Sequence, residues 1–182
     1  MSAPLSCAER GTLMNTFDIS AAYDAAFVAQ KQNLMIRAED ARDTVFLMTL
    51  FMSGSPLRVT LPPTMLSLQA ELQQRSYRDT YPRAMRRIVS DDTAPIARIM
   101  IDWSPADHSL LVDIAVTPEH QRRGIGLALL RAWIEVADTA HRSCQLSVLA
   151  DNPARLLYER LDFRVNGGDA PPFLRMGRAV GG

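Results

Sequence analysis

The sequence predicts a single α/β domain, with a mixed and mostly antiparallel sheet of about six to seven strands flanked by helices. Two observations support this fold class. Apolar runs near 84–90, 95–103 and 109–116 are separated only by short turns, as in antiparallel strands. Beyond them, helices and one further strand alternate along the chain. A chain of 182 residues is long enough for one domain with a proper core.

The N-terminal third is expected to hold three helices and one strand. Residues 1–31 form an extension, helical from about 18, whose apolar face suits a packing or oligomer element: Ile19, Ala22, Tyr23, Ala26 and Phe27. A strand at 34–37 follows, within a main domain at 32–182. A helix at 40–53 is predicted from the helical period of Ala41, Val45, Met48 and Met52. A second helix at 63–79 is predicted to turn Met65, Leu68 and Leu72 inward.

The C-terminal half has clearer patterns. The helix from 125 places seven apolar residues on one face: Ile125, Ala128, Leu129, Ala132, Trp133, Val136 and Ala137. A strand at 144–150 follows, and Asn152 is predicted to cap the next helix, with Pro153 in its first turn. That helix turns Ala154, Leu157, Tyr158 and Leu161 to one side, and a hairpin of 162–166 and 172–178 ends the fold.

Composition excludes several classes of partner. The net charge is zero and the sequence pI is about 6.8, so neither nucleic acid nor an anionic membrane is an expected partner. Cys7 and Cys144 form neither metal-ligand spacing nor a disulfide framework, and no metal is expected. With no run of membrane-spanning length and no signal-peptide pattern, we expect a cytoplasmic protein.

The most informative segment follows the third apolar run. It reads Val116-Thr117-Pro118-Glu119-His120-Gln121-Arg122-Arg123-Gly124-Ile125-Gly126-Leu127 and opens the periodic helix. Unpaired N–H groups at the start of a helix form an anion site. Glycines there let a phosphate approach the backbone, and arginines add positive charge. The segment therefore predicts a pyrophosphate site, although two glycines near a basic pair can also form a plain turn.

Two familiar glycine loops do not fit these residues. A P-loop requires a lysine and a following hydroxyl after its last glycine, and neither is present. A dinucleotide-binding loop requires a third glycine, but Gly126 is followed by Leu127, Ala128 and Leu129. The Gln-x-x-Gly-x-Gly spacing from Gln121 to Gly126 instead resembles the acetyl-coenzyme A loop of the GCN5-related N-acetyltransferase (GNAT) family.

A second segment strengthens this resemblance. Residues 146–163 are similar to the family's strand followed by an Asn-x-x-Ala-x-x-x-Tyr helix and a Leu-Gly-Phe turn. The family's turn glycine is Asp162 here, and Asp tolerates left-handed backbone angles better than most residues. The resemblance is specific over 110–163 and extends more weakly from about Asn33 to Met176.

The resemblance implies a GNAT fold in which the strand ending at Val116 splays away from the strand at 144–150. Acetyl-coenzyme A is the implied co-substrate, with its pantetheine arm on the backbone of Ile114, Ala115 and Val116. Its pyrophosphate would contact Gln121, Arg122, Arg123, Gly124, Ile125, Gly126 and Leu127, mostly through backbone N–H groups. Asn152 either hydrogen-bonds the pantetheine arm or serves as a plain helix cap, or does both.

Two catalytic residues are predicted. The resemblance implies that Tyr158 protonates the leaving thiolate, while the alternative is a core tyrosine with its hydroxyl satisfied elsewhere. Some relatives use a glutamate base where this chain has Ser147. Asp113 is the base candidate, and pairing with an arginine such as Arg98 is its alternative role. Further candidates are Asp102, His108 and His120, and a water chain or an amine of low pKa would need no dedicated base.

The predicted activity is transfer of an acetyl group to an amine of an unidentified small molecule or protein. Segment 50–81 is expected to border the acceptor, with Tyr77 and Tyr81 as lining residues, and its lack of an acidic cluster disfavours polycationic acceptors. Alternatives are a non-catalytic acyl-coenzyme A sensor on the same fold, an enzyme with a longer acyl donor and a toxin-type acetylator of aminoacyl-tRNA. A homodimer is common in the family and remains an expectation.

Overall fold

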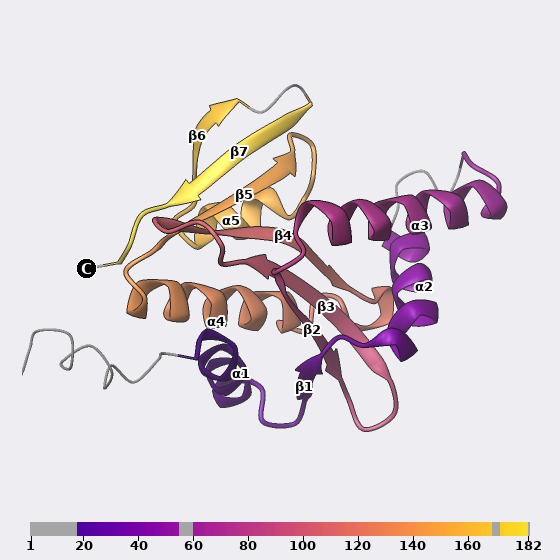
Figure 1. The fold of residues 1–182 in the computed structure, drawn as a ribbon, viewed down its shortest axis with the longest axis horizontal. Coiled ribbons are helices and arrows are strands. Elements are labelled where there is room, and N and C mark those ends of the chain that lie inside the picture. The colour runs from indigo at the N-terminus through magenta and orange to yellow at the C-terminus, as the bar shows by residue number, and fades with distance from the viewer. Residues whose placement is uncertain (1–17, 55–59, 169–171, 182) are drawn as a thin grey trace, which may run out of the picture.

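The computed structural model describes residues 18–54, 60–168 and 172–181, and within them one seven-stranded sheet carries the fold (Figure 1). The strands lie in the order β1-β2-β3-β4-β5-β7-β6. The elements are α1 (Ile19–Gln30), β1 (Met35–Ala38), a 3₁₀ helix (Ala41–Asp43), α2 (Thr44–Gly54), α3 (Pro63–Thr80), β2 (Met85–Ser90), β3 (Pro95–Asp102), β4 (His108–Val116), a second 3₁₀ helix (Pro118–His120), α4 (Ile125–Thr139), β5 (Ser143–Leu149), α5 (Arg155–Arg160), β6 (Arg164–Gly168) and β7 (Phe173–Arg178).

The sheet opens between its two central strands. All neighbouring strands are antiparallel except β4 and β5, which pair in parallel only from His108↔Ser143 to Leu111↔Leu146. A register shift opposite β3 leaves Val112 as an extra residue in β4. Beyond it, β4 continues to Val116 against β3 alone, so its edge toward β5 has no strand partner among the described residues. The predicted mixed and splayed sheet is confirmed.

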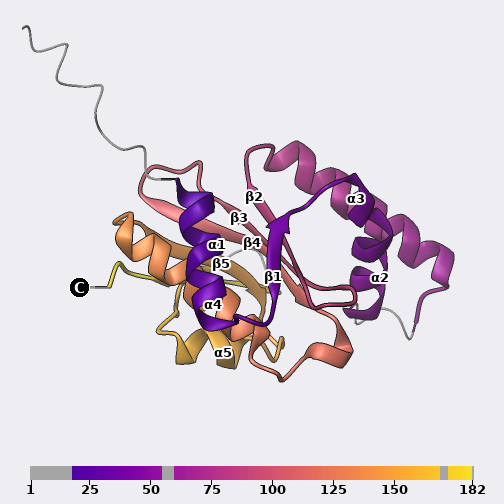
Figure 2. The ribbon, with the colours of Figure 1, turned by 90° about the horizontal axis from the view of Figure 1, so that it is seen from below.

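Helices cover both faces of the β1–β4 half of the sheet. Arg87 of β2 binds Asp24 of α1 at 2.7 Å, whereas its neighbour Arg86 donates to the Tyr81 carbonyl at the end of α3. Successive strand residues point to opposite faces. Helices α1 and α4 therefore share one face, while α2 and α3 lie on the other (Figure 2).

The helices of the α1–α4 layer bury the faces that the sequence predicts. In α4 all seven predicted residues are buried, and Trp133 is fully enclosed, with its Nε1 donating to Ser109 Oγ at 2.8 Å. In α1, Tyr23, Ala26 and Phe27 are buried, and Ile19 and Ala22 pack against the core. The extension helix is thus part of the core.

The predicted helices α2 and α3 both form, but the predicted inward face of α3 is wrong. Helix α3 buries Leu66 and Ala70 and leaves Met65, Leu68 and Leu72 each more than half exposed. Helix α2 buries Leu47 and Leu50 and leaves Val45 exposed. Each helix has apolar residues on more than one side. The spacing of apolar residues therefore identified the helices but did not show which face of each helix packs against the sheet.

The helix after β5 also starts differently from the prediction. Helix α5 has Ala154 as its N-cap, and Asn152 lies two residues earlier. The Asn152 side-chain oxygen accepts a hydrogen bond from the Ala154 N–H at 2.9 Å. This bond closes a turn that precedes the helix. Asp162 does adopt a left-handed backbone, with φ of 65°, as the resemblance requires. The predicted hairpin is present as β6 and β7, and residues 169–171 of its connection lie outside the described residues.

Candidate functional site

The loop between β4 and α4 is held by its own side chains. Gln121 Nε2 donates to the Val116 carbonyl at 3.0 Å, which ties the loop to the end of β4. Thr117 Oγ1 and His120 Nδ1 lie 2.9 Å apart within the same turn. Gln121 therefore has a structural role that its position in the motif alone did not reveal.

The start of α4 is built to receive an anion. Gly124 is its N-cap, with a left-handed φ of 78°, and no side chain caps the helix. The first turn contains no acidic residue, so the unpaired N–H groups and the positive end of the helix dipole meet no negative side chain of that turn. Gly126 follows, and a Cβ there would meet nothing within 4 Å. These features fit a pyrophosphate.

The basic residues of the loop lie where the sequence predicts them. Arg122 and Arg123 are exposed, and Arg122 has a left-handed φ of 62°, which costs a non-glycine residue of order 1 kcal/mol. Such strain is concentrated at functional sites. Ile125 is buried in the core, so only its backbone can serve a ligand. Sequence reasoning missed Lys31 at the end of α1, whose Nζ donates to the Arg123 carbonyl at 3.1 Å.

The opening between β4 and β5 leads to a cavity of about 560 Å³ on the α3 side of the sheet. Tyr77 and Tyr81 line it, together with Ser147 at the position of the family's glutamate. No carboxylate is among the lining residues of the described chain, which are Tyr77, Tyr81, His108, Leu110, Leu111, Val112, Gln145, Leu146, Ser147 and Arg175. Ile114, Ala115 and Val116 continue β4 just beyond this cavity, on the unpaired edge.

Tyr158 lies in the core as the buried residue of α5. It is 6% exposed, and its ring centroid is 6.1 Å from that of Phe163. Burial raises the pKa of Tyr158 to about 12, and the negative charge of Asp113 adds to the shift. The phenol is therefore protonated at neutral pH. Asn152, before α5, is exposed.

Asp113 belongs to a charge network centred on the buried Arg98. Arg98 on β3, which is 2% exposed, donates to Asp113 Oδ2 at 3.1 Å and to Glu39 Oε2 at 2.9 Å. The Tyr77 ring lies over the same guanidinium, with its centroid 5.6 Å away. The anticipated Arg98–Asp113 pair is present. No sequence pattern pointed to Glu39.

Two opposing effects act on the Asp113 carboxyl. Burial raises its pKa above the ordinary value, while the positive charge and hydrogen bond of Arg98 lower it, and burial prevails. A second carboxylate, Glu39, adds to the rise. A carboxylate with a raised pKa is a stronger base than an exposed one.

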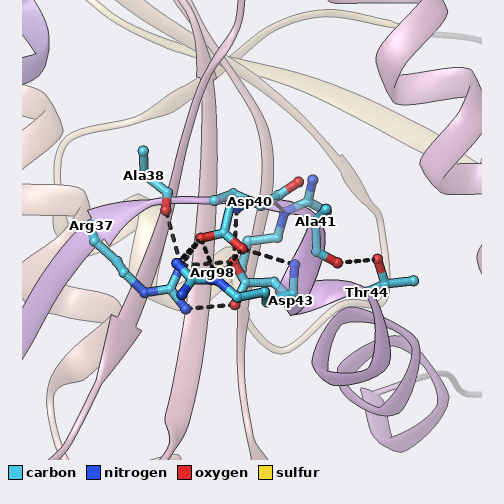
Figure 3. Close-up of polar contacts among 9 residues, drawn as sticks. Arg37, Ala38, Asp40, Ala41, Asp43, Thr44 and Arg98 are labelled. Carbon is cyan, nitrogen blue, oxygen red and sulfur yellow. Dashed lines mark hydrogen bonds and ion pairs between the residues drawn. The ribbon is translucent and has the colours of Figure 1, made fainter.

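A second ion pair anchors the segment that carries Glu39. Arg37 holds Asp43 through two hydrogen bonds of 2.8 and 2.6 Å, and Asp43 also accepts from the Asp40 N–H at 2.9 Å. Figure 3 shows these contacts, with Arg98 in the same close-up. They fix the chain between β1 and α2, and thereby the approach of Glu39 to Arg98.

The remaining base candidates have other partners or positions. Asp102 accepts from the Ser104 N–H in a turn, and His120 lies between Thr117 and Asp91. His108 does line the cavity, with its Nδ1 2.8 Å from Asp107 Oδ1. Neither Asp113 nor Tyr158 is among the cavity's lining residues.

Comparison with known proteins agrees with this geometry. Residues 87–165 match the acetyltransferase (GNAT) domain family, from within β2 to within β6, which includes the glycine loop and the strands β4 and β5. No curated protein matches the chain in sequence. The family uses acetyl-coenzyme A as its acyl donor.

Solved structures share the fold at low sequence identity. The ribosomal-protein-S18-alanine N-acetyltransferase from Escherichia coli is 19% identical, with a TM-score of 0.60 over 81% of this chain and 94% of that one. The PaiA N-acetyltransferase from Thermoplasma acidophilum, in complex with coenzyme A, is 15% identical, with a TM-score of 0.60 over 80% and 98%. Ard1 from Thermoplasma volcanium is 15% identical, with a TM-score of 0.60 over 81% and 98%.

The structure thus has an α/β fold with a splayed central sheet, and this fold is shared with solved acetyltransferase structures. More particularly, residues 87–165 match the GNAT acetyltransferase domain family. In the described part of the chain no group of histidine, cysteine, aspartate and glutamate side chains is arranged to hold a metal ion. None of the described helices is both long and apolar enough to span a membrane.

Proposed function

We propose that the protein is an N-acetyltransferase that transfers the acetyl group of acetyl-coenzyme A to an amine. The observation that carries this proposal is the juxtaposition of an anion-binding helix start at Gly124 with the unpaired edge of β4. A pyrophosphate and an amide-containing arm need these two kinds of backbone group side by side. The main domain is then 32–182, with α1 as an N-terminal addition.

The chain offers groups for each part of the donor. N–H groups from Gln121 to Leu127 hold the pyrophosphate, with Arg122 and Arg123 as counter-charges. Backbone groups of Ile114 to Val116 hold the pantetheine arm, and the exposed Asn152 amide hydrogen-bonds it from the α5 side. When bound, acetyl-coenzyme A supplies a thioester carbonyl as the electrophile.

The catalytic roles follow from the protonation states. Asp113 accepts a proton from the acceptor ammonium through a water molecule, because its side chain does not line the cavity. The neutral amine attacks the carbonyl carbon, and a β4 backbone N–H stabilises the charge on its oxygen. As the C–N bond forms and the C–S bond breaks, Tyr158 gives its phenolic proton to the sulfur, which leaves as a thiol. The second proton, which the nitrogen loses as it becomes an amide, restores the phenol through water, and Asp113 releases its proton to solvent.

The acceptor enters from the α3 side of the sheet. The cavity lined by Tyr77 and Tyr81 adjoins the opening between β4 and β5. Since its described lining contains no carboxylate, we infer an acceptor with a single amine in place of a polycation. Donor and acceptor then reach the opening from different sides.

One observation favours a second candidate function. Ser147 occupies the cavity where some relatives have a glutamate base, and a hydroxyl is not a useful base for an ammonium group. A non-catalytic acyl-coenzyme A sensor would tolerate this residue. It would bind acyl-coenzyme A with no thiol release.

Titration calorimetry with acetyl-coenzyme A, coenzyme A and a longer acyl form, followed by a thiol-release assay with amines and peptide N-termini, tests both functions. Binding with amine-dependent thiol release is the expected result. Binding without thiol release for any amine would favour the sensor, and no binding at millimolar ligand would overturn both.

A further inference from the structure

Lys31 is the only lysine in the sequence and lies at the start of α4, although it belongs to α1. It is the C-cap of α1, with its backbone N–H bonded to the Phe27 and Val28 carbonyls. Helix α1 lies beside α4, where Tyr23 Oη donates to the Leu129 carbonyl at 3.1 Å (Figure 2). This packing brings the end of α1 to the beginning of α4.

The Lys31 ammonium lies against the glycine loop. Nζ is 3.1 Å from the Arg123 carbonyl oxygen and 3.5 Å from the point that a Cβ on Gly124 would occupy. An ammonium has three donors, and only one is used in this hydrogen bond. The group is partly exposed, so its remaining donors are accessible to a ligand on the loop.

The charges at this point are all of one sign. Within residues 18–54, 60–168 and 172–181, none of Lys31, Arg122 and Arg123 forms an ion pair with a carboxylate. The positive end of the α4 dipole adds to them, with no acidic residue in its first turn. A cation at a helix N-terminus is unfavourable alone, and a bound phosphate relieves that repulsion.

We propose that Lys31 is a phosphate-binding residue of the acetyl-coenzyme A site, supplied by α1. This inference rests on the proposed function. The residue lies outside the segment 87–165 that matches the family, so the extension completes the donor site as well as the core. Lys31 acts as a point charge for a phosphate of the donor and holds the Arg123 peptide in place.

Substitutions of Lys31 separate its charge from its hydrogen bond. Lys31→Gln keeps an N–H donor for the Arg123 carbonyl but removes the charge, whereas Lys31→Arg keeps both. Arg131→Gln removes one positive charge from the exposed side of α4 and is the matched control. Calorimetry with acetyl-coenzyme A should give an approximately tenfold higher Kd for Lys31→Gln and wild-type affinity for the other two variants.

The choice of ligand shows which group Lys31 contacts. S-acetylpantetheine, which lacks the phosphates, should bind all variants equally. If the weaker binding of Lys31→Gln persists with 3′-dephospho-acetyl-coenzyme A, the contact is to the pyrophosphate, and if it disappears, the contact is to the 3′-phosphate. Either result supports a phosphate contact. Raising the salt concentration should narrow the difference between wild type and Lys31→Gln.

Two results would overturn the inference while leaving the proposed function intact. One is wild-type affinity in Lys31→Gln, and the other is equal loss in Lys31→Arg and Lys31→Gln, which would indicate a purely steric role. Failure of the folded wild-type protein to bind acetyl-coenzyme A would instead be a failure of the proposed function itself.

Discussion

Buried Arg98 and partly buried Asp113 form an ion pair across two neighbouring strands, with Arg98 Nη1 3.1 Å from Asp113 Oδ2. Arg98 has a second carboxylate partner, Glu39, at 2.9 Å. One cation therefore offsets two carboxylates beneath the Tyr77 ring. The pKa of Asp113 is raised by burial despite the positive charge of Arg98.

Asp113→Asn should reduce kcat about 10²-fold, because the amide cannot accept the proton of the acceptor. In the wild type the rate should fall as the pH drops through the raised pKa of Asp113, since only the carboxylate is a base. This acid limb should be absent from the variant's pH–rate profile.

Glu39→Gln is the matched control for this network. Glu39 raises the pKa of Asp113, so its loss should lower that pKa and shift the acid limb to lower pH. A wild-type rate and an unchanged acid limb in Asp113→Asn would remove this residue as the base.

Tyr158→Phe should lower kcat by about 10²-fold while leaving the Kd for acetyl-coenzyme A nearly unchanged, because only the proton donor is removed. The phenol's pKa of about 12 keeps it protonated, so the wild-type rate should show no basic limb from Tyr158 below that pH. Tyr23→Phe is the control, since its hydroxyl bonds the Leu129 carbonyl away from the opening. It should cost about 1 kcal/mol of stability and no activity. Equal turnover in both variants would assign Tyr158 to the core alone.

The two loop glycines should respond in opposite directions to alanine. Gly124→Ala should lower the free energy of unfolding by about 1 kcal/mol, because φ is 78° there. Gly126→Ala should raise it by up to about 1 kcal/mol, since the residue is helical with open space around it. Urea denaturation measures the free energy of unfolding of both variants. A Gly124→Ala variant as stable as the wild type would contradict the left-handed backbone at this N-cap.

Gly124→Glu should abolish binding of acetyl-coenzyme A. Its carboxylate would occupy the positive site at the start of α4 and repel the phosphates. Calorimetry is the direct measurement, with Gly54→Ala at the end of α2 as a control for a glycine outside the loop. Micromolar affinity in Gly124→Glu would refute the assignment of this loop to the pyrophosphate.

Asp43→Asn should lower the free energy of unfolding by about 2 kcal/mol at neutral pH, because it removes the charged acceptor of two Arg37 hydrogen bonds and leaves the longer ion-pair contact to Asp40, at 3.7 Å. The hydrogen bond of Arg37 holds the pKa of Asp43 below its ordinary value. Its stabilisation is thus complete above the ordinary value of 3.8 and is lost as the pH falls through the lowered one. The difference between wild type and variant should shrink over this acid range in thermal melts. A constant difference would show that the pair does not titrate.

The sequence predicted the elements of this fold better than their orientation. Strand and helix positions follow from local periodicity, so those of α1, α4, and β1 to β7 were predictable. For α4, with a single apolar stripe, the buried face was predictable as well. For α3 the buried face was not predictable, because the helix has two apolar faces. One face contains Leu66 and Ala70, which are buried, and the other contains Met65, Leu68 and Leu72, which are exposed. Only the packing of the helix against the sheet decides which face is buried.

The glycine loop that starts α4 and the helix that carries Tyr158 were predictable from the sequence alone, because a positive φ and a helix start depend on residues close together in the chain. The Arg98–Asp113 pair was anticipated from the sequence as one role of Asp113. Tertiary structure alone decided that Glu39 is the second partner of Arg98 and that Lys31 reaches the loop at Arg123. The residues of these two contacts are 59 and 92 positions apart in the chain. Contacts over such separations depend on how strands pair and helices dock, which no local pattern encodes.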